Sequence, residues 1–269
     1  MLIKNGRIID PANGVDEVND LLIEDGKVVS IGKVENYDGE TYDAAGKIVA
    51  PGFVDLHCHL RDPGFEYKED IYTGTRAAAH GGFTSVCCMA NTMPVNDNAA
   101  ITRSIIEKAH REGVVNVYPI GAITKGLKGE ELAEMGQMQK AGTVAVSDDG
   151  KPVMSGRKMY LALQYAKAFG ITVISHSEDT DITAEGQMNE GTVCTRLGLK
   201  GIPRAAEETM IARECILAEE LGTHVHIAHV STEGSVDIVR HFKSRGAKIT
   251  AETAPHYVYG TDELVEELD

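Results

Sequence analysis

The chain has 269 residues, enough for one barrel-sized domain or two small ones, and its hydrophobic fraction of 42% supports a buried core. Its net charge of -15 argues against a nucleic-acid-binding surface and against binding to anionic membranes. No apolar run approaches the ~20 residues of a membrane-spanning helix, and the N-terminus lacks the apolar core of a signal peptide.

The cysteines indicate a reduced protein. There are five, an odd number, and none forms a Cys-x-x-Cys pair: Cys58, Cys87, Cys88, Cys194 and Cys215. Because disulfides are rare where thiols are kept reduced, this usage predicts a cytoplasmic protein.

Residues 1–50 predict a small β-domain of the β-sandwich type. Turn signals such as Asp25-Gly26 alternate with apolar runs, which is typical of hairpins. Short strands are expected at residues 2–9, 18–24, 27–31, 41–43 and 48–49. So few short strands with one apolar face need further partners to be stable.

From Pro51-Gly52 onward the pattern changes to strand followed by helix. Apolar residues recur at three- and four-residue spacing between the strands, which indicates amphipathic helices. Strands are expected at residues 53–58, 84–89, 116–122, 143–147, 171–176, 224–230 and 247–252. Residues 51–269 therefore predict an α/β domain with a parallel sheet, of the TIM-like (β/α)8 barrel type.

A closed barrel needs eight strands, and only seven are predicted here. We therefore expect the last strand and a C-terminal segment to be missing from this sequence. The alternative is a complete protein with an open seven-stranded sheet, which leaves backbone groups at the sheet edges unpaired.

The first strand of the barrel ends in two histidines, His57 and His59. Side chains alternate along a strand, so two histidines separated by one residue point the same way. Two imidazoles on one face can hold a divalent metal ion, although a single buried histidine is usually only hydrogen-bonded.

Three later strands also end in metal-ligand residues. The fourth strand ends in Ser147-Asp148-Asp149, the fifth at His176 and the sixth at His229. The carboxyl ends of barrel strands meet at one face, so these side chains are expected to converge. Asp149-Gly150 alone is typical of an ordinary turn. Its place among three histidine-bearing strands favours a ligand instead.

Residues 51–64, with the sequence PGFVDLHCHLRDPG, resemble the signature of the cyclic amidohydrolases, and most closely that of the type I bacterial dihydroorotases. The resemblance extends over the whole chain. It includes MANTMP at 89–94, SDDG at 147–150, SHSED at 175–179, GIP at 201–203, HVST at 229–232 and ETAPH at 252–256.

This resemblance implies a zinc site with one or two ions. His57 and His59 match the ligands of the first metal, and His176 and His229 match those of a second. Asp149 matches a carboxylate that bridges the two. Hydantoinases and other relatives place a carbamylated lysine at that position.

Arg61 and Asn91 resemble the family's substrate-binding residues. A guanidinium binds a carboxylate through two charge-assisted hydrogen bonds, and an amide adds a directional donor. The ordinary alternatives are a surface salt bridge for Arg61 and a turn cap for Asn91. Because Arg61 follows His59 by two residues on the same alternating face, its position favours the substrate.

The implied activity is the zinc-dependent, reversible hydrolysis of L-dihydroorotate to N-carbamoyl-L-aspartate in pyrimidine biosynthesis. The family's general base is an aspartate on the eighth strand, which is expected beyond residue 269. The catalytic base of this chain is therefore unknown, and we expect little activity from the isolated chain. The expected partners are the small-molecule substrate and either a second copy of the chain or aspartate transcarbamoylase.

Two alternative functions remain open. A hydantoinase-like or allantoinase-like enzyme would carry a lysine at the bridging position, where this chain has Asp149. A non-catalytic dihydroorotase-like subunit, bound to aspartate transcarbamoylase, would lack the metal histidines.

Overall fold

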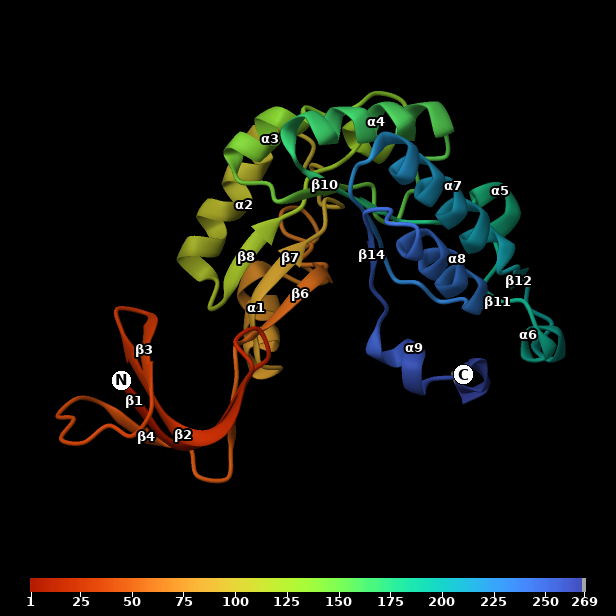
Figure 1. Ribbon diagram of the computed structural model, residues 1–269. Coiled ribbons are helices and arrows are strands. Elements are labelled where there is room, and N and C mark those ends of the chain that lie inside the picture. Colours follow the sequence, from red (N-terminus) through yellow and green to blue (C-terminus); the bar gives the residue numbers. More distant parts are fainter. Residues whose placement is uncertain (268–269) are drawn as a thin grey trace. The chain divides into compact units, whose positions relative to one another are not determined.

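The computed structural model of the protein describes residues 1–267 (Figure 1). The chain divides into two compact units, one of Met1–Phe53 and one that begins at Val54. No helix in the described part of the chain is long and apolar enough to cross a membrane.

The first unit is one five-stranded sheet. The strand order is β3-β2-β1-β4, with β5 also paired to β1. Strands β1 and β2 are antiparallel, whereas β4 and β5 run parallel to β1. Since residues 1–53 form a single sheet, a sandwich stays a prediction. The strands are β1 (Leu2–Asp10), β2 (Val15–Glu24), β3 (Lys27–Ile31), β4 (Thr41–Asp43) and β5 (Ile48–Val49).

The second unit contains all seven strands expected for the barrel. They form two sheets, in the orders β6-β7-β8 and β14-β13-β10-β9. A parallel bridge between Gly121, just after β8, and Val146 of β9 joins the two sheets. Within residues 1–267 the strand order is open, with β6 and β14 at its edges. The strands are β6 (Phe53–Cys58), β7 (Phe83–Cys88), β8 (Asn116–Pro119), β9 (Ala145–Ser147), β10 (Thr172–Ser175), β13 (Val225–Ile227) and β14 (Ile249–Ala251).

Helices cover the outer side of these strands (Figure 1). Side-chain caps fix where several begin: Asp70 accepts a hydrogen bond from the Thr73 amide, and Thr232 accepts one from the Ser235 amide. The main helices are α1 (Ile71–His80), α2 (Ala99–Glu112), α3 (Met135–Ala141), α4 (Gly156–Phe169), α7 (Ala205–Leu221) and α8 (Glu233–Ser244).

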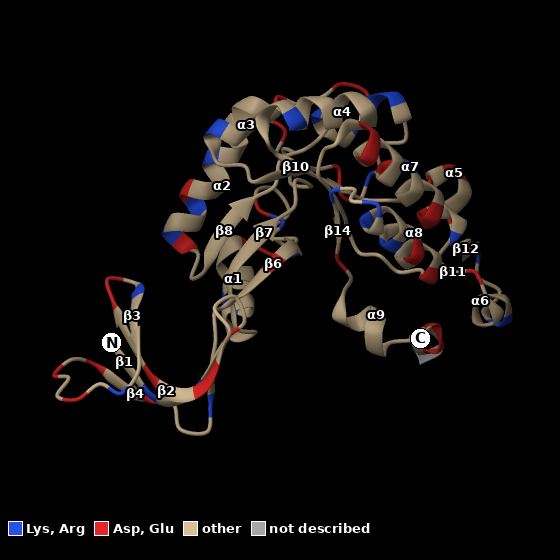
Figure 2. Cartoon of the chain, viewed as in Figure 1, with Lys and Arg blue, Asp and Glu red and all other residues tan. Residues whose placement is uncertain are grey.

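The largest hydrophobic core lies between the helices and the second sheet. Fully buried Leu163 of α4 and Ile211 of α7 pack there with Val173 and Ile227 from the strands. Strands β7 to β10, β13 and β14 contain no charged residue, and Figure 2 shows the charges mainly on helices and loops. Strands covered on both faces need this composition.

A long connecting segment, residues 176–204, separates β10 from α7. It has its own small core of Met188, Val193 and Cys194. Its elements are α5 (Thr180–Thr183), β11 (Met188–Asn189), α6 (Thr192–Leu197) and β12 (Gly201–Ile202). The remaining short elements are η1 (Lys125–Leu127), α9 (Pro255–Tyr259) and η2 (Asp262–Glu267).

Candidate metal centre

Four histidines meet one buried carboxylate at the carboxyl ends of the strands. His57 belongs to the end of β6, while Asp149, His176 and His229 follow β9, β10 and β13. His59 lies just beyond β6. The structure thus brings together all five residues that the sequence predicted as ligands.

Asp149 is the common neighbour of these histidines. Its Oδ1 lies 3.3 Å from His57 Nε2, 3.4 Å from His176 Nδ1 and 3.5 Å from His229 Nε2. Its Oδ2 lies 3.4 Å from His59 Nε2. No hydrogen bond links His57 to His59, although their ring centroids are only 5.2 Å apart.

The five residues form two groups that share Asp149. In each group the ligand atoms all lie within 4.8 Å of one another: His57, His59 and Asp149 in one, and Asp149, His176 and His229 in the other. Imidazole nitrogens and a carboxylate oxygen are the donors that zinc and similar divalent metals prefer. Each group can therefore hold a metal ion.

Helix α7 holds two of the loops that carry these predicted ligands. Arg213 donates to the carbonyl oxygens of Val153 and Met154, both at 2.8 Å, in the loop after β9. Glu207 accepts from the backbone amides of Ser231 and Thr232 after β13. His229 itself has a φ of 37°, a left-handed conformation that non-glycine residues adopt at a cost.

Three histidines also contact an oxygen with the nitrogen that faces away from Asp149. His57 Nδ1 lies 2.6 Å from Glu252 Oε1, and His59 Nδ1 lies 3.0 Å from Asn91 Oδ1. His176 Nε2 lies 3.1 Å from Glu178 Oε2. Such contacts fix the tautomer and orientation of a metal-binding histidine.

Glu252 and Glu178 received no role from the sequence. Both lie inside segments that resemble the family, and Glu178 follows His176 by two residues. The sequence therefore contained a weak signal for each. Asn91, predicted to bind substrate, has its carbonyl oxygen engaged by His59, and its amide nitrogen is the group left for a ligand.

The charges of this cluster support one another. Burial alone would raise the pKa of Asp149, but hydrogen bonds from His176, His229 and His57 outweigh it and hold that pKa far below its usual range. Burial would lower the pKa of His57, yet its contacts with Asp149 and Glu252 raise it to about 9. The negative charge of Asp149 and the positive charge on the imidazoles around it therefore favour each other.

Asp148 has a different environment from its neighbour. Its Oδ1 accepts hydrogen bonds from the amides of Ile123 at 2.7 Å and Thr124 at 3.0 Å, and its Oδ2 accepts one from the Thr124 hydroxyl. Burial raises the pKa of Asp148 to about 6 despite these bonds. Asp148 therefore fastens β9 to the loop after β8, and only Asp149 faces the histidines.

Arg61 lies beside the histidines, on the loop that follows β6. It has a φ of 57°, and its charge contributes, after burial, to a lowered pKa of His59. The next residue, Asp62, is buried and pairs with Lys108 of α2 at 2.7 Å. No carboxylate pairs with the Arg61 guanidinium among the side chains of residues 1–265.

A hollow of about 360 Å³ opens next to the histidine cluster. This volume is that of a pocket for a small molecule. The hollow is lined by Asp55, His57, His59, His229, Glu252 and residues 253–257.

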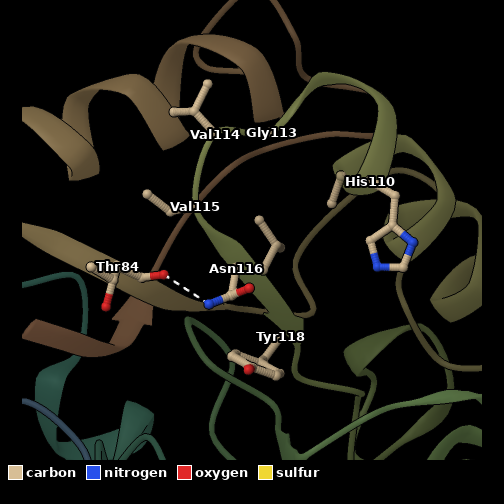
Figure 3. A pocket seen from close by; sticks show the side chains of 9 residues that line it. Thr84, His110, Gly113, Val114, Val115, Asn116 and Tyr118 are labelled. Carbon is tan, nitrogen blue, oxygen red and sulfur yellow. Dashed lines mark hydrogen bonds between the residues drawn. The ribbon is translucent and has the colours of Figure 1, made fainter. Parts of the chain in front are cut away.

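A second hollow lies at the opposite, amino end of β7 and β8 (Figure 3). There Asn116 donates to the carbonyl oxygen of Thr84 at 3.1 Å. His110 is the single titratable nitrogen on its lining, which carries no carboxylate. This hollow offers no comparable set of ligands.

Comparison with known proteins gives a consistent result. A family model described as Dihydro-orotase-like matches residues 46–235. A protein of Syntrophotalea carbinolica named dihydroorotase is 56% identical over 270 residues, covering 100% of this chain and 64% of the relative. One of Geobacter sp. strain M21, with the same name, is 60% identical over 271 residues, with the same coverage.

Solved structures show the same fold. The L-hydantoinase (dihydropyrimidinase) from Arthrobacter aurescens superposes with a TM-score of 0.84 at 24% sequence identity, over 99% of this chain and 61% of that one. The chain spans 63–64% of the length of the curated relatives that it matches. The family-model match and the identities across the whole chain show that it belongs to the dihydro-orotase-like family of the amidohydrolase superfamily.

Proposed function

We propose that a protein carrying this chain is a dihydroorotase, which hydrolyses L-dihydroorotate reversibly to N-carbamoyl-L-aspartate. The observation that carries the proposal is the pair of three-ligand groups sharing Asp149, in a chain 56–60% identical to proteins named dihydroorotase. The likeness to solved hydantoinases supports a (β/α)8 barrel as the complete architecture.

Zinc is the proposed metal. The donor set of four imidazoles and one carboxylate fits it, and the outward nitrogens of His57, His59 and His176 already have oxygen partners. His57, His59 and Asp149 would hold one ion, and Asp149, His176 and His229 a second. When bound, zinc lowers the pKa of a coordinated water towards ~7 and polarises the ring carbonyl.

Arg61 is proposed to bind the substrate carboxylate. Its guanidinium lies close enough to influence His59, and no side-chain carboxylate within residues 1–265 pairs with it. The Asn91 amide nitrogen is proposed as a further donor to the substrate. No residue in the described part of the chain is assigned as general base.

A dihydroorotase is favoured over the hydantoinase-like alternative because Asp149 occupies the bridging position, where those enzymes carry a modified lysine. It is favoured over a non-catalytic subunit because the metal histidines are present. The five cysteines are free, which supports the proposed cytoplasmic location. Self-association and binding to aspartate transcarbamoylase stay predictions.

The test compares two substrates on a zinc-loaded protein that carries this chain. L-Dihydroorotate has a ring carboxylate, and dihydrouracil is the same ring without it. We expect turnover of dihydroorotate and little of dihydrouracil. The double variant His57→Ala with His59→Ala should lose most of its zinc and its turnover.

Preferred hydrolysis of dihydrouracil would replace the proposal with a dihydropyrimidinase-like activity. Unchanged zinc content in the double variant would show that these histidines are not the ligands. A control variant, Arg103→Lys on the exposed side of α2, should retain both zinc and turnover.

A further inference from the structure

A second set of polar side chains lies on β10, β13 and β14 or directly beside these strands, next to the proposed metal ligands. His224 lies just before β13 and His226 within it, and the register of the sheet places His226 beside Thr250. Glu252 follows Thr250 by two residues, just after β14. We call Thr172, His224, Thr250, His226 and Glu252 the histidine ladder.

The ladder is a continuous series of close polar contacts that ends at the metal site. Thr172 Oγ1 lies 3.1 Å from His224 Nδ1, and His224 Nε2 lies 2.9 Å from Thr250 Oγ1. Thr250 Oγ1 lies 2.8 Å from His226 Nδ1. His226 Nε2 then lies 3.3 Å from Glu252 Oε2, and the other Glu252 oxygen contacts His57 Nδ1 at 2.6 Å.

The contact between His226 and Glu252 decides where the protons are. His226 is 6% exposed, and its Nε2 has no well-aligned hydrogen bond to any described residue, so the carboxylate is its nearest acceptor. A carboxylate can only accept, so a lone pair on Nε2 would face it at a cost. His226 therefore carries a proton on Nε2, and in the neutral ring Nδ1 accepts from the Thr250 hydroxyl.

The position of the proton on His226 determines the direction of the other hydrogen bonds in the ladder. Because Thr250 donates to His226, its oxygen accepts from His224 Nε2, and His224 Nδ1 accepts from the Thr172 hydroxyl. Each group of the ladder then donates its hydrogen to the next group in the direction of Glu252. The other Glu252 oxygen accepts a hydrogen bond from His57 Nδ1, so Nε2 is the His57 nitrogen that faces Asp149.

We propose that Glu252, held by the histidine ladder, is a positioning residue that locks His57 in the tautomer able to bind metal through Nε2. The inference rests on the proposed metal centre and adds residues that do not touch the metal. Without the ladder Glu252 would be free to rotate away from His57. With it, the carboxylate is fastened at both oxygens.

A purely structural role for the ladder would also satisfy buried polar groups. The two roles differ in what they predict for metal binding. If the ladder only fills the space between strands, its loss lowers stability and leaves zinc affinity unchanged. If it positions His57, zinc affinity falls even in variants whose metal-free stability is normal.

The first experiment measures zinc affinity by competition with a chelator, using Glu252→Gln. The amide keeps the shape of the side chain but cannot accept at both ends, so we expect zinc to bind about 10- to 100-fold more weakly. The matched control is Glu219→Gln, since Glu219 of α7 pairs with Arg245 on the surface. Its zinc affinity should equal that of the unaltered protein.

A second pair of variants tests the ladder two links away from His57. Valine and serine are each close in size to threonine, so both substitutions at Thr250 should leave the fold intact. Thr250→Val removes the hydroxyl and should weaken zinc binding measurably. Thr250→Ser keeps the hydroxyl and should restore it. Thermal unfolding without metal shows whether either change acts through stability alone.

The proton positions can be read directly from the nitrogen chemical shifts of the histidine rings in the zinc-loaded protein. We expect His226 to be protonated on Nε2 only, and His57 on Nδ1. Protonation of His226 on Nδ1 with a bare Nε2, or unchanged zinc affinity in Glu252→Gln, would overturn the inference and leave the metal centre standing. Failure of the unaltered protein to bind zinc would overturn both.

Discussion

Two neighbouring carboxylates, Asp148 and Asp149, show how local contacts separate the roles of similar residues. Both are buried, and burial disfavours the charge of each. Three histidines compensate Asp149 and hold its pKa very low, whereas Asp148 has only hydroxyl and amide partners and a pKa of about 6. The carboxylate whose anionic form is favoured is therefore the one surrounded by imidazoles.

Arg61 gives the first prediction at the scale of single residues. Arg61→Lys keeps the positive charge but loses the planar pair of donors that matches a carboxylate. We expect binding of dihydroorotate or carbamoyl-aspartate to weaken by about 2 kcal/mol, the scale of a hydrogen bond to a charged group. Calorimetric titration of the zinc-loaded protein measures the change.

The same titration on Arg103→Lys separates this effect from a general loss of charge. If Arg61→Lys and Arg61→Ala both bind the ligands normally, the guanidinium has no part in substrate binding.

At the scale of elements, loops after neighbouring strands support one another. Pro63, in the loop after β6, accepts a hydrogen bond from the Met93 amide in the loop after β7 at 2.8 Å. Gly64 has a φ of +98°, and a Cβ there would lie 2.0 Å from the Met93 carbonyl oxygen. This contact sets the distance between the loops that carry Arg61 and Asn91.

Gly64→Ala should therefore destabilise the protein and disturb substrate binding together. Gly246→Ala is the matched control, because Gly246 has a φ of +89° with open space around it. Both variants introduce backbone strain, and only the first adds a clash with a backbone atom. We expect Gly64→Ala to cost about 1–3 kcal/mol more in the free energy of unfolding. Equal losses in the free energy of unfolding, measured in urea, would show that the two loops accommodate the added methyl group without extra strain.

The sequence predicts the regular strands well and the connecting segment after β10 poorly. The seven strands of the second unit stand out because each is a short apolar run between turn signals. Between residues 180 and 202 no element exceeds six residues, and β11 and β12 have two each. Periodicity cannot mark such short elements, which depend on the packing of Met188, Val193 and Cys194.

The site divides in the same way. That His57, His59, Asp149, His176 and His229 lie together was predictable, because each stands at the end of a recognisable strand or just after it; that they hold metal stays a prediction. Glu252 and the histidine ladder were not. Their role depends on contacts across 195 residues of sequence, as between His57 and Glu252, and on which ring nitrogen faces which oxygen. Only the folded arrangement of β10, β13 and β14 defines them.

At the scale of the whole molecule, the proposed metal centre joins parts of the chain that are distant in sequence. Its predicted ligands come from the end of β6 in the first sheet and from the ends of β9, β10 and β13 in the second. A metal bound there links both sheets, so it should stabilise the native state over the unfolded chain. Asp149, common to both ligand groups, is the residue on which this link depends.

The most direct test of the metal centre is the zinc content of three proteins prepared without chelator and measured by elemental analysis. The unaltered protein and Asp148→Asn should each retain one or two zinc ions per chain. Asp149→Asn, an identical change one residue away, should retain little or none. Equal zinc in Asp148→Asn and Asp149→Asn would contradict the account, since the carboxylate shared by both ligand groups would then have no part in holding metal.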